Sequence, residues 1–187
     1  MINKILIFGS QGSGSTTLAK ELAKRFNYFL IEADDIIFKP SEYPYINPRT
    51  KEEKVTLLDK LVKDHSRFII AGSIIGFDDH VHDFDLIIYL HLPKEIRLKR
   101  IKEREKQKYQ DAILPNGKYY TMHQDFLSWA SMYDELPAGV RSFSQHQEYL
   151  RKCNTIIEII NEELPLEELV NRIYKKYLGV KNEKNGY

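Results

Sequence analysis

Five short apolar runs divide the chain, and segments with a helical spacing of apolar positions lie between them. The runs are found at residues 4–8, 28–31, 67–72, 86–92 and 155–160. Continuous apolar runs of this length are typical of strands buried on both faces of a parallel sheet. Apolar positions spaced three and four apart predict helices. These helices cover residues 16–26, 51–65, 93–108, 119–133, 140–151 and 165–178.

The alternation of strands and helices predicts an α/β layer fold with a mainly parallel sheet. Two segments interrupt it. Residues 40–50 contain three prolines and residues 109–118 contain Pro115, Asn116 and Gly117, so both predict irregular loops. The aromatic residues of 119–133 recur every three or four positions, a spacing that favours core packing over ligand contact. We expect one domain of residues 1–180 that includes both loops and a helical insertion at 109–151, followed by a frayed tail at 181–187.

Composition mainly excludes alternatives. The chain has 187 residues, and 28 basic against 27 acidic side chains give a net charge of +1, which selects neither nucleic acid nor a membrane surface. A single cysteine, Cys153, excludes an internal disulfide, suits a reducing compartment and is expected to be buried and inert. His80 and His82 lack a third nearby ligand, so a metal role for them is disfavoured. We expect a cytoplasmic globular protein.

The strongest chemical signal is the stretch GSQGSGSTT at residues 9–17, directly after the first apolar run. It fits the phosphate-binding pattern Gly-x-x-x-x-Gly-Lys-Ser/Thr at Gly9, Gly14 and Thr16. Glycines allow successive N–H groups to turn inward around an anion, and the following helix adds its free N–H groups and positive dipole end. Thr16 holds the position from which a hydroxyl ligates Mg²⁺. A plain glycine-rich turn is the alternative.

The pattern lacks its cation, because Ser15 stands where the lysine belongs. That lysine normally places a point charge on the β- and γ-phosphates. A single preorganised group of this kind is worth about 3 kcal/mol in catalysis. Another cation must therefore replace it if phosphoryl transfer is to proceed efficiently.

An acidic cluster follows the second apolar run, at Glu32, Asp34 and Asp35. The carboxyl ends of parallel strands share one edge of the sheet, so this cluster should face the glycine loop. One carboxylate there could hold Mg²⁺ through water, and another could orient or deprotonate an acceptor hydroxyl. Capping of a short helix by Asp34 or Asp35 is the structural alternative.

The stretch GSQGSGSTTLAKELAKRFNYFLIEADD resembles the start of P-loop small-molecule and nucleotide kinases, especially those that are shikimate-kinase-like and adenylate-kinase-like. The resemblance covers about residues 1–108 and 154–178. It implies a three-layer α/β/α fold with a five-stranded parallel sheet, a helical lid, ATP and Mg²⁺ as cofactors, and phosphoryl transfer to a hydroxyl or phosphate. The implied nucleotide-binding residues are Gly9, Gln11, Gly12, Ser13, Gly14, Ser15, Thr16 and Thr17, and the implied metal-binding residues are Thr16 and Glu32.

Three departures from the kinase pattern stand out. Ser15 replaces the lysine, and Glu32 replaces the first aspartate of the acid-x-acid pair of the shikimate type. Strand three ends in Ala71-Gly72-Ser73 without an acidic residue. The chain also looks similar to bacterial adenylate-kinase-like ATPases that carry Ser or Thr at the lysine position, which would make Ser15 a family trait.

Four cations share one face of the helix at 93–108, namely Arg97, Arg100, Arg104 and Lys108. The resemblance implies that arginines here flank a lid and clamp the ATP phosphates, so Arg100 and Arg104 are expected to supply the charge missing at Ser15. A solvated helix face with weak internal ion pairs is the alternative.

For the acceptor, we expect Asp34 to orient the reacting group and Asp35, Arg49 and Arg141 to contact the molecule. The leading hypothesis is an ATP-dependent phosphotransferase acting on a small-molecule or nucleotide acceptor. A nucleotide-binding module that signals through lid ordering, with little or no turnover, is the second. An ATPase or GTPase is less favoured, because the guanine motif Asn-Lys-x-Asp is absent from the sequence.

Overall fold

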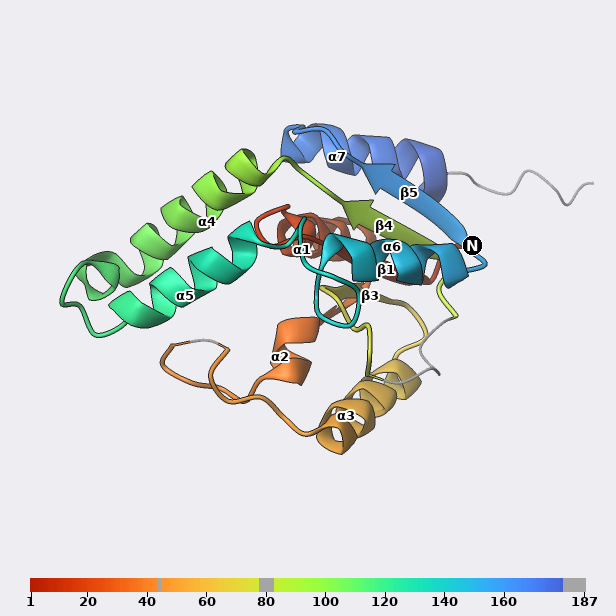
Figure 1. Cartoon of the computed structure of the whole chain (residues 1–187). Helices are drawn as coiled ribbons and strands as arrows, with labels where there is room; N and C mark the ends of the chain where they lie inside the picture. Colours follow the sequence, from red (N-terminus) through yellow and green to blue (C-terminus); the bar gives the residue numbers. More distant parts are fainter. Residues whose placement is uncertain (44, 78–82, 180–187) are drawn as a thin grey trace, which may run out of the picture.

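The computed structural model describes residues 1–43, 45–77 and 83–179, and their central element is a parallel sheet (Figure 1). Its strands are β1 (Lys4–Gly9), β2 (Phe29–Glu32), β3 (Phe68–Ala71), β4 (Leu86–Leu90) and β5 (Ile156–Ile160). The sheet has five strands in the order β2-β3-β1-β4-β5, and all four pairings are parallel. The predicted five-stranded parallel α/β fold is therefore confirmed.

Helices cover both faces of the sheet because β1 buries alternate side chains on opposite sides. Ile5 and Ile7 pack with α1 (Ser15–Phe26) and α7 (Leu166–Ile173), which a π-helical turn at Tyr174–Leu178 extends. Leu6 and Phe8 pack with three helices on the other face. These are α2 (Ala33–Ile37), α3 (Lys51–Asp64) and α6 (Phe143–Lys152). This arrangement brings the carboxyl ends of all strands to one edge.

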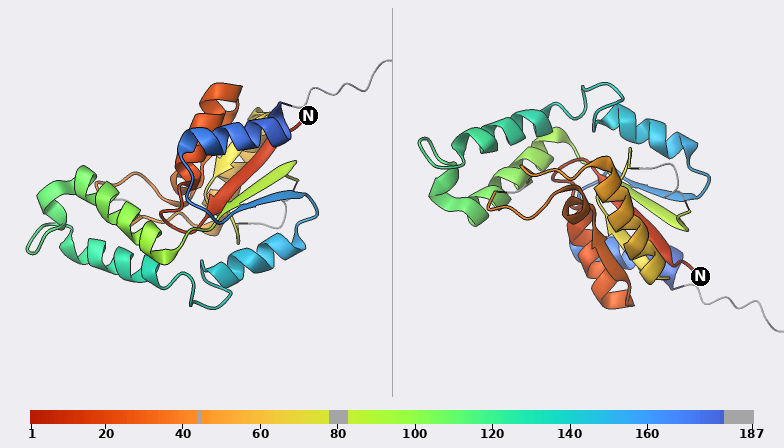
Figure 2. Two further views of the ribbon diagram at one scale, coloured as in Figure 1. Left: turned by 90° about the horizontal axis from the view of Figure 1, so that it is seen from above. Right: turned by 90° about the horizontal axis from the view of Figure 1, so that it is seen from below.

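The remaining helices form an arm beyond that edge of the sheet (Figures 1 and 2). The arm consists of α4 (Lys94–Tyr109), a 3₁₀ turn (Gln110–Ile113) and α5 (Tyr120–Ser131), and we call it the α4–α5 arm. Tyr43, from the loop at 40–50, packs against its tip with ring centroids 5.0 Å from Tyr109 and 4.9 Å from Tyr119. The proline-rich loop is thus fixed to the arm by aromatic contacts.

Several local expectations change. The acidic cluster belongs mostly to a short helix, because α2 begins at Ala33 directly after β2. Its N-cap is Glu32, and no side chain of the described residues caps it, so capping by Asp34 or Asp35 is wrong. Cys153 is only half-buried, and its thiol lies 3.3 Å from the carbonyl oxygen of Tyr149. Burial raises the pKa of this thiol, which favours the unreactive protonated form.

The described residues include no helix that is both long and apolar enough to cross a membrane. His80, His82 and the tail at 181–187 lie outside the described residues.

Candidate functional site

The glycine loop between β1 and α1 has the backbone geometry of an anion cradle. Gly12 and Gly14 adopt positive φ angles of 79° and 96°, which only glycine adopts without strain. Gly14 is also the N-cap of α1, and within the described chain no side chain caps that helix, so its first N–H groups stay available. The loop is packed tightly from behind, because a Cβ at Gly12 would lie 2.5 Å from the carbonyl oxygen of Arg97.

Several buried polar side-chain atoms of this loop have no hydrogen-bond partner among the described residues. Ser10 and Ser13 are each 2% exposed, yet their hydroxyls make no hydrogen bond within the described protein. The same holds for the amide of Gln11. Buried polar groups are normally satisfied, so unsatisfied donors beside free helix N–H groups fit a polyphosphate that the protein would bind here. Ser15, Thr16 and Thr17 continue the lining in the first turn of α1.

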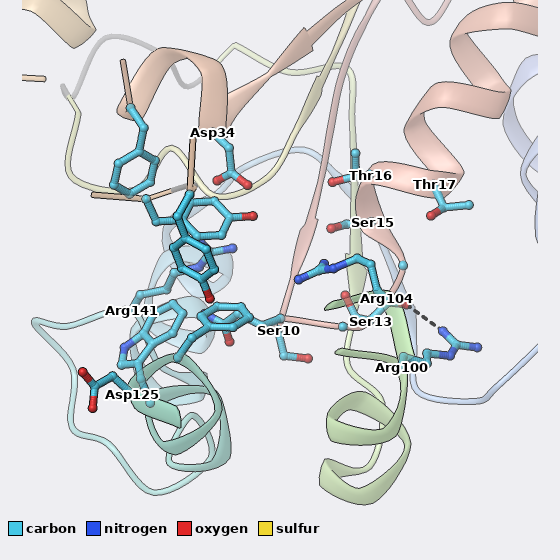
Figure 3. A pocket seen from close by; sticks show the side chains of 18 of the residues that line it. Ser10, Ser13, Ser15, Thr16, Thr17, Asp34, Arg100, Arg104, Asp125 and Arg141 are labelled. Carbon is cyan, nitrogen blue, oxygen red and sulfur yellow. Dashed lines mark hydrogen bonds between the residues drawn. The ribbon is translucent and has the colours of Figure 1, made fainter. Parts of the chain in front are cut away.

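A cavity of about 780 Å³ extends from this loop to the α4–α5 arm (Figure 3). Its polar lining combines the loop with side chains from four other parts of the chain. These are Asp34 of α2, Arg100 and Arg104 of α4, Asp125 of α5 and Arg141 before α6. The structure therefore brings together most of the residues expected from the sequence, although they are up to 131 positions apart, from Ser10 to Arg141.

The two α4 arginines lie differently against the cavity. Nη1 of Arg100 donates to the carbonyl oxygen of Ser13 at 3.4 Å, while its Nη2 pairs with Glu163 at 2.8 Å. Among the described residues Arg104 forms an ion pair with Glu105 alone, at 3.1 Å, and half of its side chain is exposed. Figure 3 shows the Arg104 guanidinium pointing into the cavity. Arg104 is therefore the less constrained of the two arginines and the one better able to contact a ligand in the cavity.

Glu105 holds Arg104 from behind. This carboxylate is 3% exposed and accepts a hydrogen bond from the hydroxyl of Tyr43 at 3.3 Å. Nδ1 of His123 lies 3.7 Å from it on the side of α5. Because Glu105 links α4, α5 and the proline-rich loop, it fixes the base from which Arg104 extends. The charge pattern of the sequence could not distinguish this buried acid from its exposed neighbours.

Arg97 does not belong to the cationic face on which its spacing placed it. It is 0% exposed, and its Nε donates to the carbonyl oxygen of Leu92 at 2.8 Å while its Nη2 pairs with Asp134. Its guanidinium also lies 5.2 Å from the ring centre of Tyr133. Arg97 therefore anchors the α4–α5 arm to the sheet instead of facing phosphates.

A buried polar chain continues from that anchor. The hydroxyl of Tyr89 lies 2.9 Å from the hydroxyl of Tyr133, which lies 2.6 Å from Nδ1 of His146. The pKa of His146 is lowered to about 3, mainly by burial and to a smaller degree by the positive charge of Arg141. His146 is therefore neutral at physiological pH and serves as a hydrogen-bond partner between α5 and α6.

The acidic residues separate into three environments. Asp34 lines the cavity. Glu32 lies 3.0 Å from Lys20 and is not among the lining residues. Asp35 is exposed and also lies off the lining. Of the acidic cluster, the structure brings only Asp34 to the cavity, opposite the glycine loop (Figure 3).

Arg49 lies apart from the cavity lining as well. Its Nη1 donates to three backbone carbonyls at the end of α2, those of Asp35, Ile36 and Phe38, at 2.6 Å, 3.2 Å and 2.5 Å. These carbonyls need partners because a helix leaves its last acceptors unsatisfied. The geometry is that of a brace that holds α2, and with it Asp34, in place.

Aromatic side chains form the wall of the cavity nearest the arm. We call Phe38, Tyr45, Phe126 and Trp129 the aromatic wall. Tyr45 and Phe126 stack at 5.8 Å, and Phe126 and Trp129 lie 6.0 Å apart. The expectation of core packing holds for Tyr119 and Tyr133, at 8% and 1% exposed, but not for Phe126 and Trp129, which are only half-buried.

Tyr45 reports the charges around this wall. The residue is 37% exposed, yet its pKa is raised to about 12, mainly because its hydroxyl is desolvated. The negative charge of Asp34 contributes to this increase in pKa, while Arg104 and Arg141 oppose it. One tyrosine hydroxyl thus lies within the field of the acid and of both arginines. Asp34, Arg104 and Arg141 therefore line the same cavity as the aromatic wall.

Comparison with known proteins agrees with this geometry. Residues 5–119 match the family described as AAA domain. The chain is 30% identical to the uncharacterized protein YqaC of Bacillus subtilis, over 92% of this chain and 96% of that one. It is 32% identical to a cytidylate kinase of Saccharolobus islandicus, over 64% of this chain and 68% of the kinase. A solved shikimate kinase from Bacteroides thetaiotaomicron superposes with a TM-score of 0.58 at 17% identity, covering 96% of this chain and 100% of that one.

Proposed function

The chain belongs to the AAA domain family and has the fold of P-loop kinases, and from this premise we propose that it transfers the γ-phosphate of ATP to a hydroxyl group of a small acceptor. One observation carries the proposal. A single cavity joins a loop whose buried Ser10 and Ser13 hydroxyls await an anion to a carboxylate, Asp34, on the opposite side. A phosphoryl donor and its acceptor need these two ends in one enclosed space.

At the phosphate end, the N–H groups of the loop and the hydroxyls of Ser10 and Ser13 would bind the β-phosphate. Ser15 can donate a hydrogen bond but carries no charge. Arg104 would replace the missing cation, since it points into the cavity and is paired only with its neighbour Glu105 in the described protein. Arg100 would support the loop through the carbonyl oxygen of Ser13.

At the acceptor end, Asp34 would receive the proton of the acceptor hydroxyl. The hydroxyl oxygen forms a bond to the γ-phosphorus, the bond from that phosphorus to the bridging oxygen breaks, and ADP leaves with the electron pair. Arg104 would stabilise the charge that spreads over the transferring oxygens, an effect that depends on positioning more than on covalent chemistry.

The residue best placed to contact Mg²⁺ directly is Thr16, which offers a hydroxyl in the first turn of α1 and lines the cavity. No cluster of three or more acidic, histidine or cysteine ligands occurs within the described ranges, so phosphate oxygens and water would have to supply most ligands of a bound Mg²⁺. Mg²⁺ would neutralise part of the phosphate charge when bound. Glu32, which pairs with Lys20, would act there only through water.

The decisive experiment is an ADP-release assay with ATP, Mg²⁺ and a panel of hydroxyl and phosphate acceptors. We expect release that depends on one acceptor class, and a rate about a hundredfold lower in Arg104→Ala, the cost of one preorganised charge. Lys106→Ala is the matched control, because it removes an exposed charge of the same helix that does not line the cavity. An equal loss in both variants would contradict the role of Arg104.

Ser15 favours a second candidate, a module that binds nucleotide and signals without turnover. Ser15→Lys separates the two. If Arg104 already supplies the charge, the added lysine increases the rate little or crowds the site. Turnover that appears only in Ser15→Lys would identify the natural protein as the binding module.

A further inference from the structure

We infer that the acceptor carries a planar heteroaromatic ring of the nucleobase kind, bound against the aromatic wall. The inference rests on the proposed function and names its substrate class. The phosphate loop and Asp34 are indifferent to what the rest of the acceptor looks like, so the class must be decided by the cavity beyond them. There the lining changes from hydroxyls and amides to rings.

The rings of the aromatic wall form a broad, mainly apolar surface of the cavity, in which Phe38 meets Tyr45 edge-on at 69°. Tyr45 and Phe126 are inclined by 27°, and Phe126 and Trp129 by 34°. The side chains come from two separate segments, residues 38–45 and α5, that meet at the cavity. Ile46 and Met122 extend this surface and are 47% and 41% exposed. Aromatic rings that line a cavity bind other planar rings by stacking or by edge-to-face contact.

Polar groups at this wall are few and of opposite charge. Asp125 offers hydrogen-bond acceptors, and Arg141 offers donors, with Nε buried and without a partner among the described residues. The Arg141 guanidinium lies 6.0 Å from the ring centre of Trp129. A nucleobase presents donors and acceptors along one edge and a flat apolar face, which matches this lining. A polyhydroxylated, non-aromatic acceptor would leave the ring faces uncovered and find few partners for its hydroxyls.

The base of the donor nucleotide has a different place available. Leu164, Leu166 and Leu169 line the cavity at the start of α7, near Glu163, which pairs with Arg100. Figure 3 shows Arg100 and Thr17 on one side of the glycine loop and Arg141 and Asp125 on the other. A nucleotide gripped by the loop can thus direct its base toward the leucines and leave the aromatic wall to the acceptor.

The chain carries its own reporter of this binding, because Trp129 is its single tryptophan. The experiment uses the full chain saturated with Mg²⁺ and β,γ-methylene-ATP, so that the donor side is filled and no turnover occurs. Adenosine, cytidine, guanosine and thymidine are then titrated, each also as its 5′-monophosphate, with shikimate and glucose as non-aromatic probes. We expect quenching of Trp129 by at least one nucleoside or nucleotide and none by the non-aromatic probes. The paired arms test whether a free hydroxyl, the group that the proposed function phosphorylates, is preferred over a 5′-phosphate.

Two variants test the wall itself. Phe126→Leu should weaken binding of the ligand that quenches Trp129 about tenfold, the range of one base–aromatic stack. Calorimetry should find that the affinity of this variant for the ATP analogue is unchanged. Tyr120→Leu is the matched control, because Tyr120 is an exposed aromatic residue of the same helix that does not line the cavity. Equal weakening in both variants would overturn the inference.

Other outcomes separate this inference from the proposed function. Quenching by the ATP analogue alone, with no further change on adding nucleosides, would assign the wall to the donor base and overturn the inference. Acceptor-dependent ADP release with a non-aromatic compound would overturn it but leave the kinase function standing. Nucleoside binding without any ADP release would support the ring site and contradict the kinase function.

Discussion

The two ends of the cavity are built in opposite ways. The proposed phosphate end consists of consecutive residues, and its geometry comes from backbone torsions such as those of Gly12 and Gly14. The proposed acceptor end consists of side chains from α2, the loop at 40–50, α5 and the segment before α6. A polyphosphate is the same in every reaction, so one local motif suffices for it. An acceptor differs between enzymes, and its site is assembled from segments that can change independently.

The largest effect on the rate of phosphoryl transfer is expected from a substitution at Asp34. Asp34→Asn removes the proposed base but preserves its size, so the rate should fall about a thousandfold, the range of general-base catalysis, with ATP affinity little changed. Asp35→Asn is the control, since the neighbouring side chain is exposed and off the cavity. Steady-state rates and calorimetry of both variants test this. A normal rate in Asp34→Asn would remove Asp34 from the chemistry.

At the other end of the cavity, Gly12→Ala is expected to disrupt the glycine loop. A Cβ there would lie 2.5 Å from the carbonyl oxygen of Arg97, and the φ of 79° disfavours alanine as well. We expect ATP binding to weaken about a hundredfold, a loss of about 3 kcal/mol, in calorimetric titrations. Gly76→Ala controls for strain alone, because its φ is 85° but no atom of the described protein lies within 4 Å of the added carbon. Similar losses in the two variants would mean that strain, and not the packed loop, is responsible.

The stability of the protein should decrease at acidic pH because of the buried His146. The pKa of His146 falls to about 3 in the folded protein, against about 6.5 when unfolded. Between these values the unfolded chain binds the extra proton, so stability is full above about pH 6.5 and declines as the pH falls, by up to about 1.4 kcal/mol per unit. Denaturant unfolding from pH 7 to pH 4 measures the slope. His146→Gln should flatten it, and an unchanged slope would assign the acid sensitivity to other groups.

The smallest effect is expected at Arg49. Its bonds to the carbonyls of Asp35, Ile36 and Phe38 hold α2, so Arg49→Ala should lower the free energy of unfolding by about 1 kcal/mol. As an acceptor-binding residue it would instead raise KM at unchanged stability. Thermal unfolding together with KM distinguishes the brace from the contact. Arg151→Ala, an exposed arginine of α6, provides the comparison.

The sequence predicted the consecutive residues of the glycine loop better than the dispersed residues at the other end of the cavity. The loop at 9–17 was readable because its residues are consecutive, and Asp34 because one strand fixes its distance from the loop. Arg97 was placed with Arg100 and Arg104 because helical spacing gives neighbours on a face but not the partner of that face, and Asp134 lies 37 positions away. Phe126 and Trp129 have the spacing of core residues, and only the tertiary arrangement shows that they line a cavity.

Arg97 joins the two ends in one further respect. Its side chain roots α4 in the sheet, while its carbonyl oxygen faces the backbone of Gly12 with no room for even a methyl group between them. A tilt of the α4–α5 arm about this root would press one main chain directly on the other. The position of the α4–α5 arm and the backbone path of the glycine loop are therefore constrained by one shared contact.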